Sequence, residues 1–90
     1  MTKKEMEIIE AVRKMSPING AGYKSFSESR AVIAKAMGYP TKHQRVNRYR
    51  TEEVLTNHED YDKVYQIIEG MEKHNIIRFS KSRSCFKLMV

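Results

Sequence analysis

The chain has 90 residues, with 17 Lys and Arg against 11 Asp and Glu, which gives a formal net charge of +6. A chain of this length builds one domain with a thin core and no deep catalytic cleft, so we expect a binding protein and not an enzyme. The basic excess favours an acidic partner. Cys85 is alone, which excludes an internal disulfide, and the sequence shows no export signal or membrane-spanning run, so we expect a cytoplasmic protein.

Capping signals predict two helices in the first half of the chain. Residues 2–5 form a capping box, in which a hydroxyl and a carboxylate satisfy free backbone donors, and apolar residues follow at helical spacing. This pattern predicts a helix over residues 1–15. A glycine-containing loop comes next, and a second capping box at residues 25–28 begins a helix that Gly38 ends.

A third capping box, at residues 41–44, directly follows Pro40. It predicts a third helix joined to the second by a tight turn, so that a helix-turn-helix spans residues 25–56. On a helical wheel the face expected to meet the core holds Val46, Tyr49, Arg50, Glu53 and Val54. The opposite, polar face holds Gln44, Arg45, Asn47 and Arg48.

A fourth helix and a hairpin complete the predicted domain. The helix, over residues 59–75, has the clearest apolar stripe, with Asn57 or Asp60 as its cap and Asn75 as its terminator. Over residues 76–90 the apolar period changes from about 3.6 to about 2, which predicts an antiparallel hairpin with a polar, cationic tip. The predicted fold is therefore mainly α, with four helices and a C-terminal β-hairpin.

This order of elements resembles the winged helix-turn-helix family over about residues 25–90, with residues 1–15 as an additional N-terminal helix. The resemblance rests on the tight helix-turn-helix, on the further amphipathic helix over residues 59–75, and on the basic hairpin into which that helix leads. It implies a single winged-helix domain over residues 1–90 that binds double-stranded DNA, most often as a transcriptional regulator. One departure is that Val46 follows the turn glycine later than the family's apolar anchor does.

The charges are unevenly distributed, which is a second departure. Residues 41–50 and 76–90 each hold four Lys or Arg and no acid, whereas residues 57–75 hold two Lys and five acids. Phosphate would repel the acidic segment, although many winged domains read DNA with the helix at that position. We therefore expect the 41–50 helix to read DNA, since Arg can bridge guanine and Asn or Gln can bridge adenine. The candidate DNA contacts are Thr41, Lys42, His43, Gln44, Arg45, Asn47 and Arg48 on the helix, and Lys81 and Arg83 on the wing.

Other interpretations remain open. The same shape fits a protein-binding accessory module, for example a phage-encoded one, that docks on a host transcription or defence protein through the acidic helix or by strand addition at residues 85–90. RNA is a third target class, and a homodimer would use the first helix or the last strand. No metal or cofactor is expected, because no ligand spacing connects His43, His58, His74 and Cys85.

Overall fold

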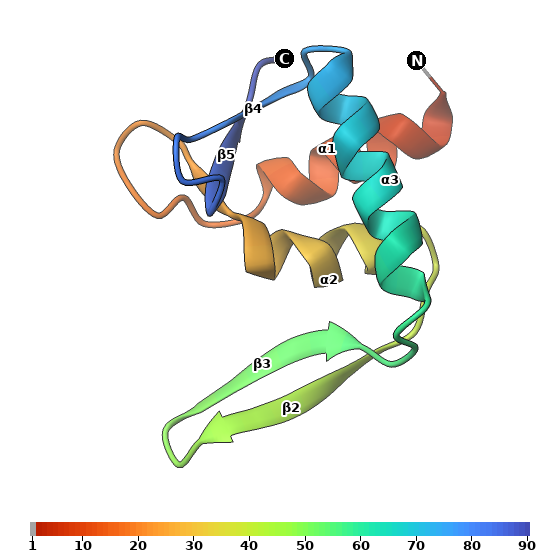
Figure 1. Ribbon diagram of the computed structural model, residues 1–90, viewed down its shortest axis with the longest axis vertical. Coiled ribbons are helices and arrows are strands. Elements are labelled where there is room, and N and C mark those ends of the chain that lie inside the picture. Colours follow the sequence, from red (N-terminus) through yellow and green to blue (C-terminus); the bar gives the residue numbers. More distant parts are fainter. Residues whose placement is uncertain (1) are drawn as a thin grey trace.

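The computed structural model describes residues 2–90, where three helices and five strands form an α/β arrangement (Figure 1). In chain order the elements are α1 (Lys3–Arg13), β1 (Lys24–Ser25), α2 (Phe26–Ala36), β2 (Thr41–Asn47), β3 (Arg50–Leu55), α3 (Asp60–Lys73), β4 (Ile77–Phe79) and β5 (Cys85–Leu88). The strands form two antiparallel sheets, one of order β1-β5-β4 and one made of β2 and β3. The predicted fold of four helices plus a wing is therefore wrong.

Helices α1 and α2 begin at the predicted capping boxes. The Thr2 side chain accepts a hydrogen bond from the Glu5 backbone N–H at 3.1 Å, and the Ser25 side chain accepts one from Glu28 at 3.4 Å. Both contacts satisfy backbone donors that have no partner inside the helix. Gly38 follows α2 with a φ of +87°, the left-handed conformation that glycine adopts without strain. Met1, the first residue of the predicted 1–15 helix, lies outside the described residues.

Helix α3 lies within the predicted 59–75 segment, although its start differs from the prediction. Glu59 occupies the cap position without a side-chain hydrogen bond to the helix, so neither predicted cap is used. Asn75 has a φ of 60°, which ends the helix and turns the chain into β4 as expected of a terminator. The predicted position of the fourth helix is therefore confirmed, whereas the predicted capping residue is wrong.

The C-terminal hairpin is present and carries a third strand. β4 pairs with β5 in antiparallel register, with Phe79 opposite Phe86 and Arg78 opposite Lys87. β1 adds to the other side of β5, with Ser25 opposite Cys85. β1 therefore covers only Cys85 and Phe86 on that side of β5, and strand addition, expected over residues 85–90, is not available at these two residues.

The core lies among the three helices and the inner face of the three-stranded sheet. Phe86 from β5 is fully buried, and Phe79 packs against it with ring centroids 5.6 Å apart. The buried cluster consists of Ile8, Ile9, Val12, Ile33, Ala34, Leu55, Val64, Ile68, Met71, Ile77 and Phe86. No helix in residues 2–90 is long and apolar enough to span a membrane.

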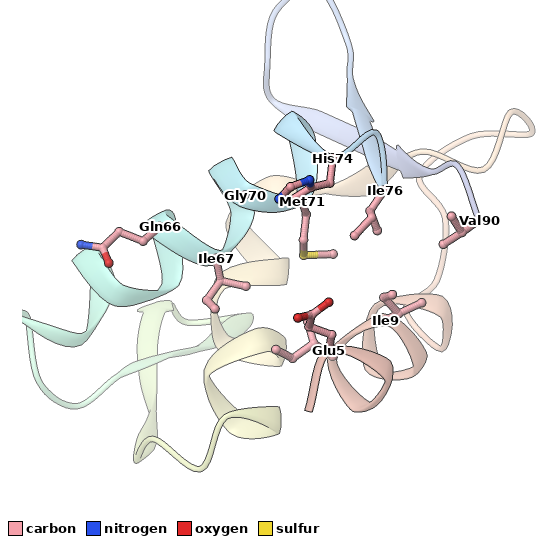
Figure 2. A pocket seen from close by; sticks show the side chains of 10 residues that line it. Glu5, Ile9, Gln66, Ile67, Gly70, Met71, His74, Ile76 and Val90 are labelled. Atoms are coloured by element: carbon pink, nitrogen blue, oxygen red, sulfur yellow. The ribbon is translucent and has the colours of Figure 1, made fainter. Parts of the chain in front are cut away.

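A mostly apolar cleft of about 550 Å³ remains between α1, α3 and the end of the chain. Figure 2 shows Glu5 from α1 and Met71 from α3 pointing toward each other across it. Val90 lines its rim and is 57% exposed. The cleft therefore leaves part of the α1–α3 contact open to solvent.

Residues 41–50 are not helical. They form β2 and a turn, and β3 completes an antiparallel hairpin that Figure 1 shows extending beyond α2, away from α1 and the other sheet. The helix prediction failed because this hairpin has no buried face over most of its length, so its sequence carries no alternation of apolar and polar residues. Thr41 pairs with β3 instead of capping a helix.

Candidate nucleic-acid interface

The β2–β3 hairpin, which we call the ribbon, projects from the domain as a solvated arm. Residues 42–52 are all exposed, on both faces of the two strands. An isolated two-stranded hairpin is only marginally stable in water, so the ribbon depends on its attachment to the domain. That attachment is at its base, where Leu55 is 4% exposed and the Thr56 N–H donates to the Pro40 carbonyl at 3.1 Å.

Glu53 fixes the base of the ribbon to α2. Its carboxylate accepts a hydrogen bond from the Thr41 hydroxyl at 2.7 Å and lies 3.0 Å from the Lys35 ammonium. The Thr41 hydrogen bond, aided by Lys35, lowers the pKa of Glu53 below its usual range. The Glu53 charge is therefore matched by a cation of the body and does not oppose an anionic ligand further along the ribbon.

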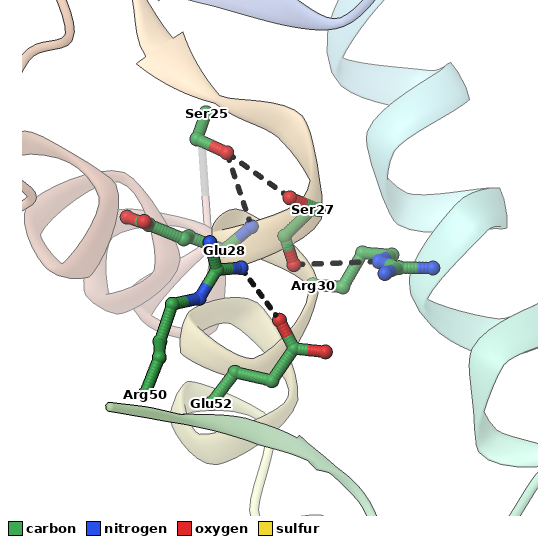
Figure 3. Close-up of polar contacts among 6 residues, drawn as sticks. All are labelled: Ser25, Ser27, Glu28, Arg30, Arg50 and Glu52. Carbon is green, nitrogen blue, oxygen red and sulfur yellow. Dashed lines mark hydrogen bonds and ion pairs between the residues drawn. The ribbon is translucent and has the colours of Figure 1, made fainter. Parts of the chain in front are cut away.

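An open groove separates β3 from the start of α2. The groove has a volume of about 610 Å³ and is lined by β3 and by the first turns of α2. Figure 3 shows Arg50 and Glu52 of β3 pointing toward Glu28 across it, and the Arg50 guanidinium donates to Glu52 at 3.2 Å. Acids and bases alternate in this groove, so it is not a cationic pocket.

The structure divides the predicted DNA contacts on residues 41–48 between the two faces of the ribbon. Arg45 lies opposite Thr51 and Gln44 lies opposite Glu52. Directly opposed residues share a face and neighbours along a strand alternate, so Arg45 and Gln44 point to different sides. The seven residues are brought together on one element, but they do not form the single face that a helix would have given.

The tip of the ribbon is held by local hydrogen bonds. The Tyr49 backbone N–H donates to Asn47 Oδ1 at 2.8 Å, and Arg45 Nε donates to the Asn47 carbonyl at 3.3 Å. Tyr49 is 88% exposed and Val46 is 48% exposed, and Arg50 also lies in solvent. Placing these three residues on a core-facing side was wrong, because all three are exposed and none of them belongs to the buried core.

Three cations of the ribbon are unpaired. Within residues 2–90, no carboxylate forms a salt bridge with Lys42, Arg45 or Arg48. Both acids of the ribbon, Glu52 and Glu53, are already engaged by Arg50 and by Lys35 with Thr41. The ribbon therefore presents uncompensated positive charge toward solvent.

The three-stranded sheet carries a second basic surface. Arg78 and Lys87 lie directly opposite each other on β4 and β5, although like charges at such positions are destabilising. Lys81, one of the two predicted wing contacts, is exposed in the β4–β5 turn. Helix α2 lies between this sheet and the ribbon (Figure 1), so the two predicted groups of contacts occupy separate surfaces.

Arg83, the other predicted wing contact, is engaged by α3. Its guanidinium donates two hydrogen bonds to the Glu72 carboxylate, at 2.9 and 3.0 Å, and lies 4.2 Å from the centroid of the Phe79 ring. These contacts hold Arg83 against the domain. A phosphate would have to compete with Glu72 for this side chain.

Charge counting found the cations but missed three members of these surfaces. Arg78 and Lys87 lie in the acid-free 76–90 segment. The sequence therefore showed their charge, but it did not show that the two side chains lie opposite each other on the sheet. Tyr49 gave no signal, because its exposure depends on the ribbon that the sequence pattern did not reveal.

No group of three or more His, Cys, Asp or Glu within the described part of the chain is placed to hold a metal ion. No family model, curated protein or solved structure matches the chain.

Proposed function

We propose that this protein binds double-stranded DNA through the β2–β3 ribbon, in the role that the sequence assigned to a recognition helix. The observation that carries the proposal is the exposure of residues 42–52 on both faces, combined with three unpaired cations on the same arm. An arm of this kind contributes almost nothing to the core, whereas its charge complements phosphate. The proposal includes a cytoplasmic location and a role in gene regulation.

The dimensions of the ribbon suit the major groove. The groove is about 12 Å wide and admits a two-stranded β-ribbon. The face that carries Arg45 and Thr51 has no free carboxylate near the tip, because Glu52 lies on the opposite face and Glu53 is paired at the base. We place the Arg45 face against the base edges, where its guanidinium can donate two hydrogen bonds to guanine. Arg48 at the tip then contacts a phosphate, whereas Lys42, which shares the face of Gln44, adds to the attraction through its charge.

The second basic surface has a different role in the proposal. The β4–β5 hairpin, which carries Arg78, Lys81 and Lys87, lies across α2 from the ribbon (Figure 1), so the two groups of cations do not line the same groove. Their field adds to the attraction of the whole domain for DNA and increases the rate of encounter, most strongly at low salt.

A fluorescence anisotropy titration with a labelled duplex tests the proposal. With about two or three phosphates neutralised by Lys42, Arg45 and Arg48, the slope of log K against log salt should be about −2 to −3. The variant Arg45→Ala/Arg48→Ala should bind at least about tenfold more weakly, because it loses one base contact and one phosphate contact.

Lys3→Ala/Lys14→Ala is the matched control, since it removes the same charge from exposed positions at the two ends of α1. An equal loss of affinity in both variants would show that net charge alone drives binding and that the ribbon is not the site. Failure of the native protein to bind at low salt would overturn the proposal. Recovery of a protein partner that survives nuclease treatment, together with that failure, would favour the protein-binding alternative.

A further inference from the structure

Tyr49 differs from the other four tyrosines in its surroundings. Tyr61 and Tyr65 both belong to α3, and their ring centroids lie 6.1 Å apart in an aromatic cluster. Tyr23 and Tyr39 are half-buried beside lysines. Tyr49 is 88% exposed at the tip of the ribbon. Its ring therefore has an aromatic face that no residue of the domain covers.

The tip presents that ring in a defined position. Asn47 and Arg50 are paired across the ribbon, so Arg48 and Tyr49 form a two-residue loop at its far end. The hydrogen bond from the Tyr49 N–H to Asn47 Oδ1 fixes the backbone of this loop. The Arg48 guanidinium lies 5.9 Å from the centroid of the Tyr49 ring, so a cation accompanies the ring wherever the tip binds.

We propose that Tyr49 stacks on an unpaired base, and that the preferred ligand of the ribbon is a DNA duplex interrupted by an unpaired nucleotide. This inference rests on the proposed function, because the charge of the ribbon brings the tip to DNA. Bases inside a perfect duplex already stack on their neighbours and offer no free face to the ring. An unpaired base leaves the stack at little cost, and an exposed aromatic side chain can then cover it.

The cations beside the ring complement this ligand. Arg48 precedes Tyr49 in the loop, and Arg45 and Lys42 continue the unpaired charge down the same strand. The duplex on one side of the unpaired nucleotide would then lie along the ribbon while the ring meets the base at the interruption. Charge alone predicts equal affinity for the perfect and the interrupted duplex, so a preference between them measures the contribution of the ring.

The test compares two labelled duplexes of equal length and sequence, one perfect and one with a single bulged nucleotide, by anisotropy. The native protein should bind the bulged duplex about five- to hundredfold more tightly, the range that stacking on one base provides. Tyr49→Ala should abolish that preference and keep the affinity for the perfect duplex within about threefold, whereas Tyr49→Phe should retain it. Val46→Ala is the matched control, since it removes apolar surface from the same tip without removing the ring.

A second readout reports on the base itself. With 2-aminopurine as the bulged nucleotide, the native protein and Tyr49→Phe should change its fluorescence on binding, and Tyr49→Ala should not. Equal affinity of the native protein for the two duplexes would overturn this inference and leave the proposed function intact. Absence of binding to either duplex would overturn both. Equal weakening of both duplexes in Tyr49→Ala would show a general contact and also overturn the stacking role.

Discussion

Arg83 and Glu72 join the β4–β5 turn to α3 through two parallel hydrogen bonds of 2.9 and 3.0 Å. This bidentate geometry orders two exposed side chains that would otherwise move freely. The pairing lowers the pKa of Glu72 from its usual value of 4.5, chiefly through the hydrogen bonds from Arg83. It also fixes a turn in which Arg83 has a φ of 58°, a conformation unfavourable for a residue with a Cβ.

Acid should weaken this connection before the domain unfolds. Because the pKa of Glu72 is depressed in the folded state, its contribution to stability is complete above the unfolded value and disappears as the pH falls through the folded value. Glu72→Gln should therefore be less stable than the native protein at pH 7, and this difference should shrink as the pH falls through the folded pKa of Glu72. Urea unfolding over a series of pH values from 7 downward measures the difference. A difference that persists in acid would show that the carboxylate charge is not the cause.

The base of the ribbon should respond to the loss of one hydroxyl. Thr41→Val removes the hydrogen bond that is the largest cause of the lowered pKa of Glu53, so that pKa should rise toward 4.5. A carboxyl ¹³C NMR titration measures it directly. Amide exchange along β3 should also become faster, since Glu53 ties the ribbon to α2. Thr51→Val, an exposed change on the same face of the ribbon, should leave both measurements unchanged.

The core should be far more sensitive than the ribbon. Phe86→Ala removes a fully buried ring and should cost about 3 to 5 kcal/mol of unfolding free energy. Tyr49→Ala, at an 88% exposed position, should change it by less than about 0.5 kcal/mol. Because domains of this size are stable by only about 5 to 15 kcal/mol, the Phe86 variant should be close to unfolding. Chemical denaturation of the two variants side by side gives the comparison.

The N-cap of α2 should make a measurable contribution to the free energy of unfolding. Ser25→Ala removes the side chain that accepts from the Glu28 N–H and should cost about 1 kcal/mol. Ser27→Ala removes only the exposed hydroxyl contact to Ser25, 3.2 Å away, and leaves the bond to the Glu28 N–H, so it should have little effect. Thermal unfolding of both variants distinguishes a capping role from a general effect of removing a hydroxyl.

Excision of the ribbon should leave a folded domain. Replacement of residues 43–52 by a short Gly-Ser linker removes exposed residues and keeps Leu55 in the core. The helical circular dichroism signal and cooperative unfolding should persist, whereas binding to duplex DNA should be lost. Loss of cooperative unfolding would show that the ribbon supports the core, contrary to its exposure.

The sequence predicted those elements whose burial leaves a periodic pattern. The capping boxes at Thr2 and Ser25, followed by apolar stripes, located α1 and α2, and the stripe of α3 located the third helix. The ribbon was not predicted, because solvent surrounds both of its faces over most of its length. Its apolar residues therefore follow neither a clear helical period nor a strand period. The Thr41 capping box was then read as a helix start. β1 escaped because it has two residues and forms only by pairing with β5.

The sequence predicted which residues supply the positive charge of the candidate site, but it did not predict how their side chains are arranged. Local counting located the clusters of cations, because charge is a property of the sequence alone. Whether Arg45 and Gln44 share a face depends on the backbone, and the change from helix to strand separated them. Arg83 shows the same limit, since its partner Glu72 belongs to another element eleven residues away in the chain.

The closure of the ribbon at its base has an evolutionary consequence. The chain leaves the domain after Pro40 and returns at Thr56, where a backbone hydrogen bond of 3.1 Å joins the two points. Substitutions, insertions or an exchange within residues 42–52 remove no buried residue, because Leu55 at the base of the ribbon stays in the core. Selection can therefore change the ligand that we propose for the ribbon while the rest of the domain stays constant.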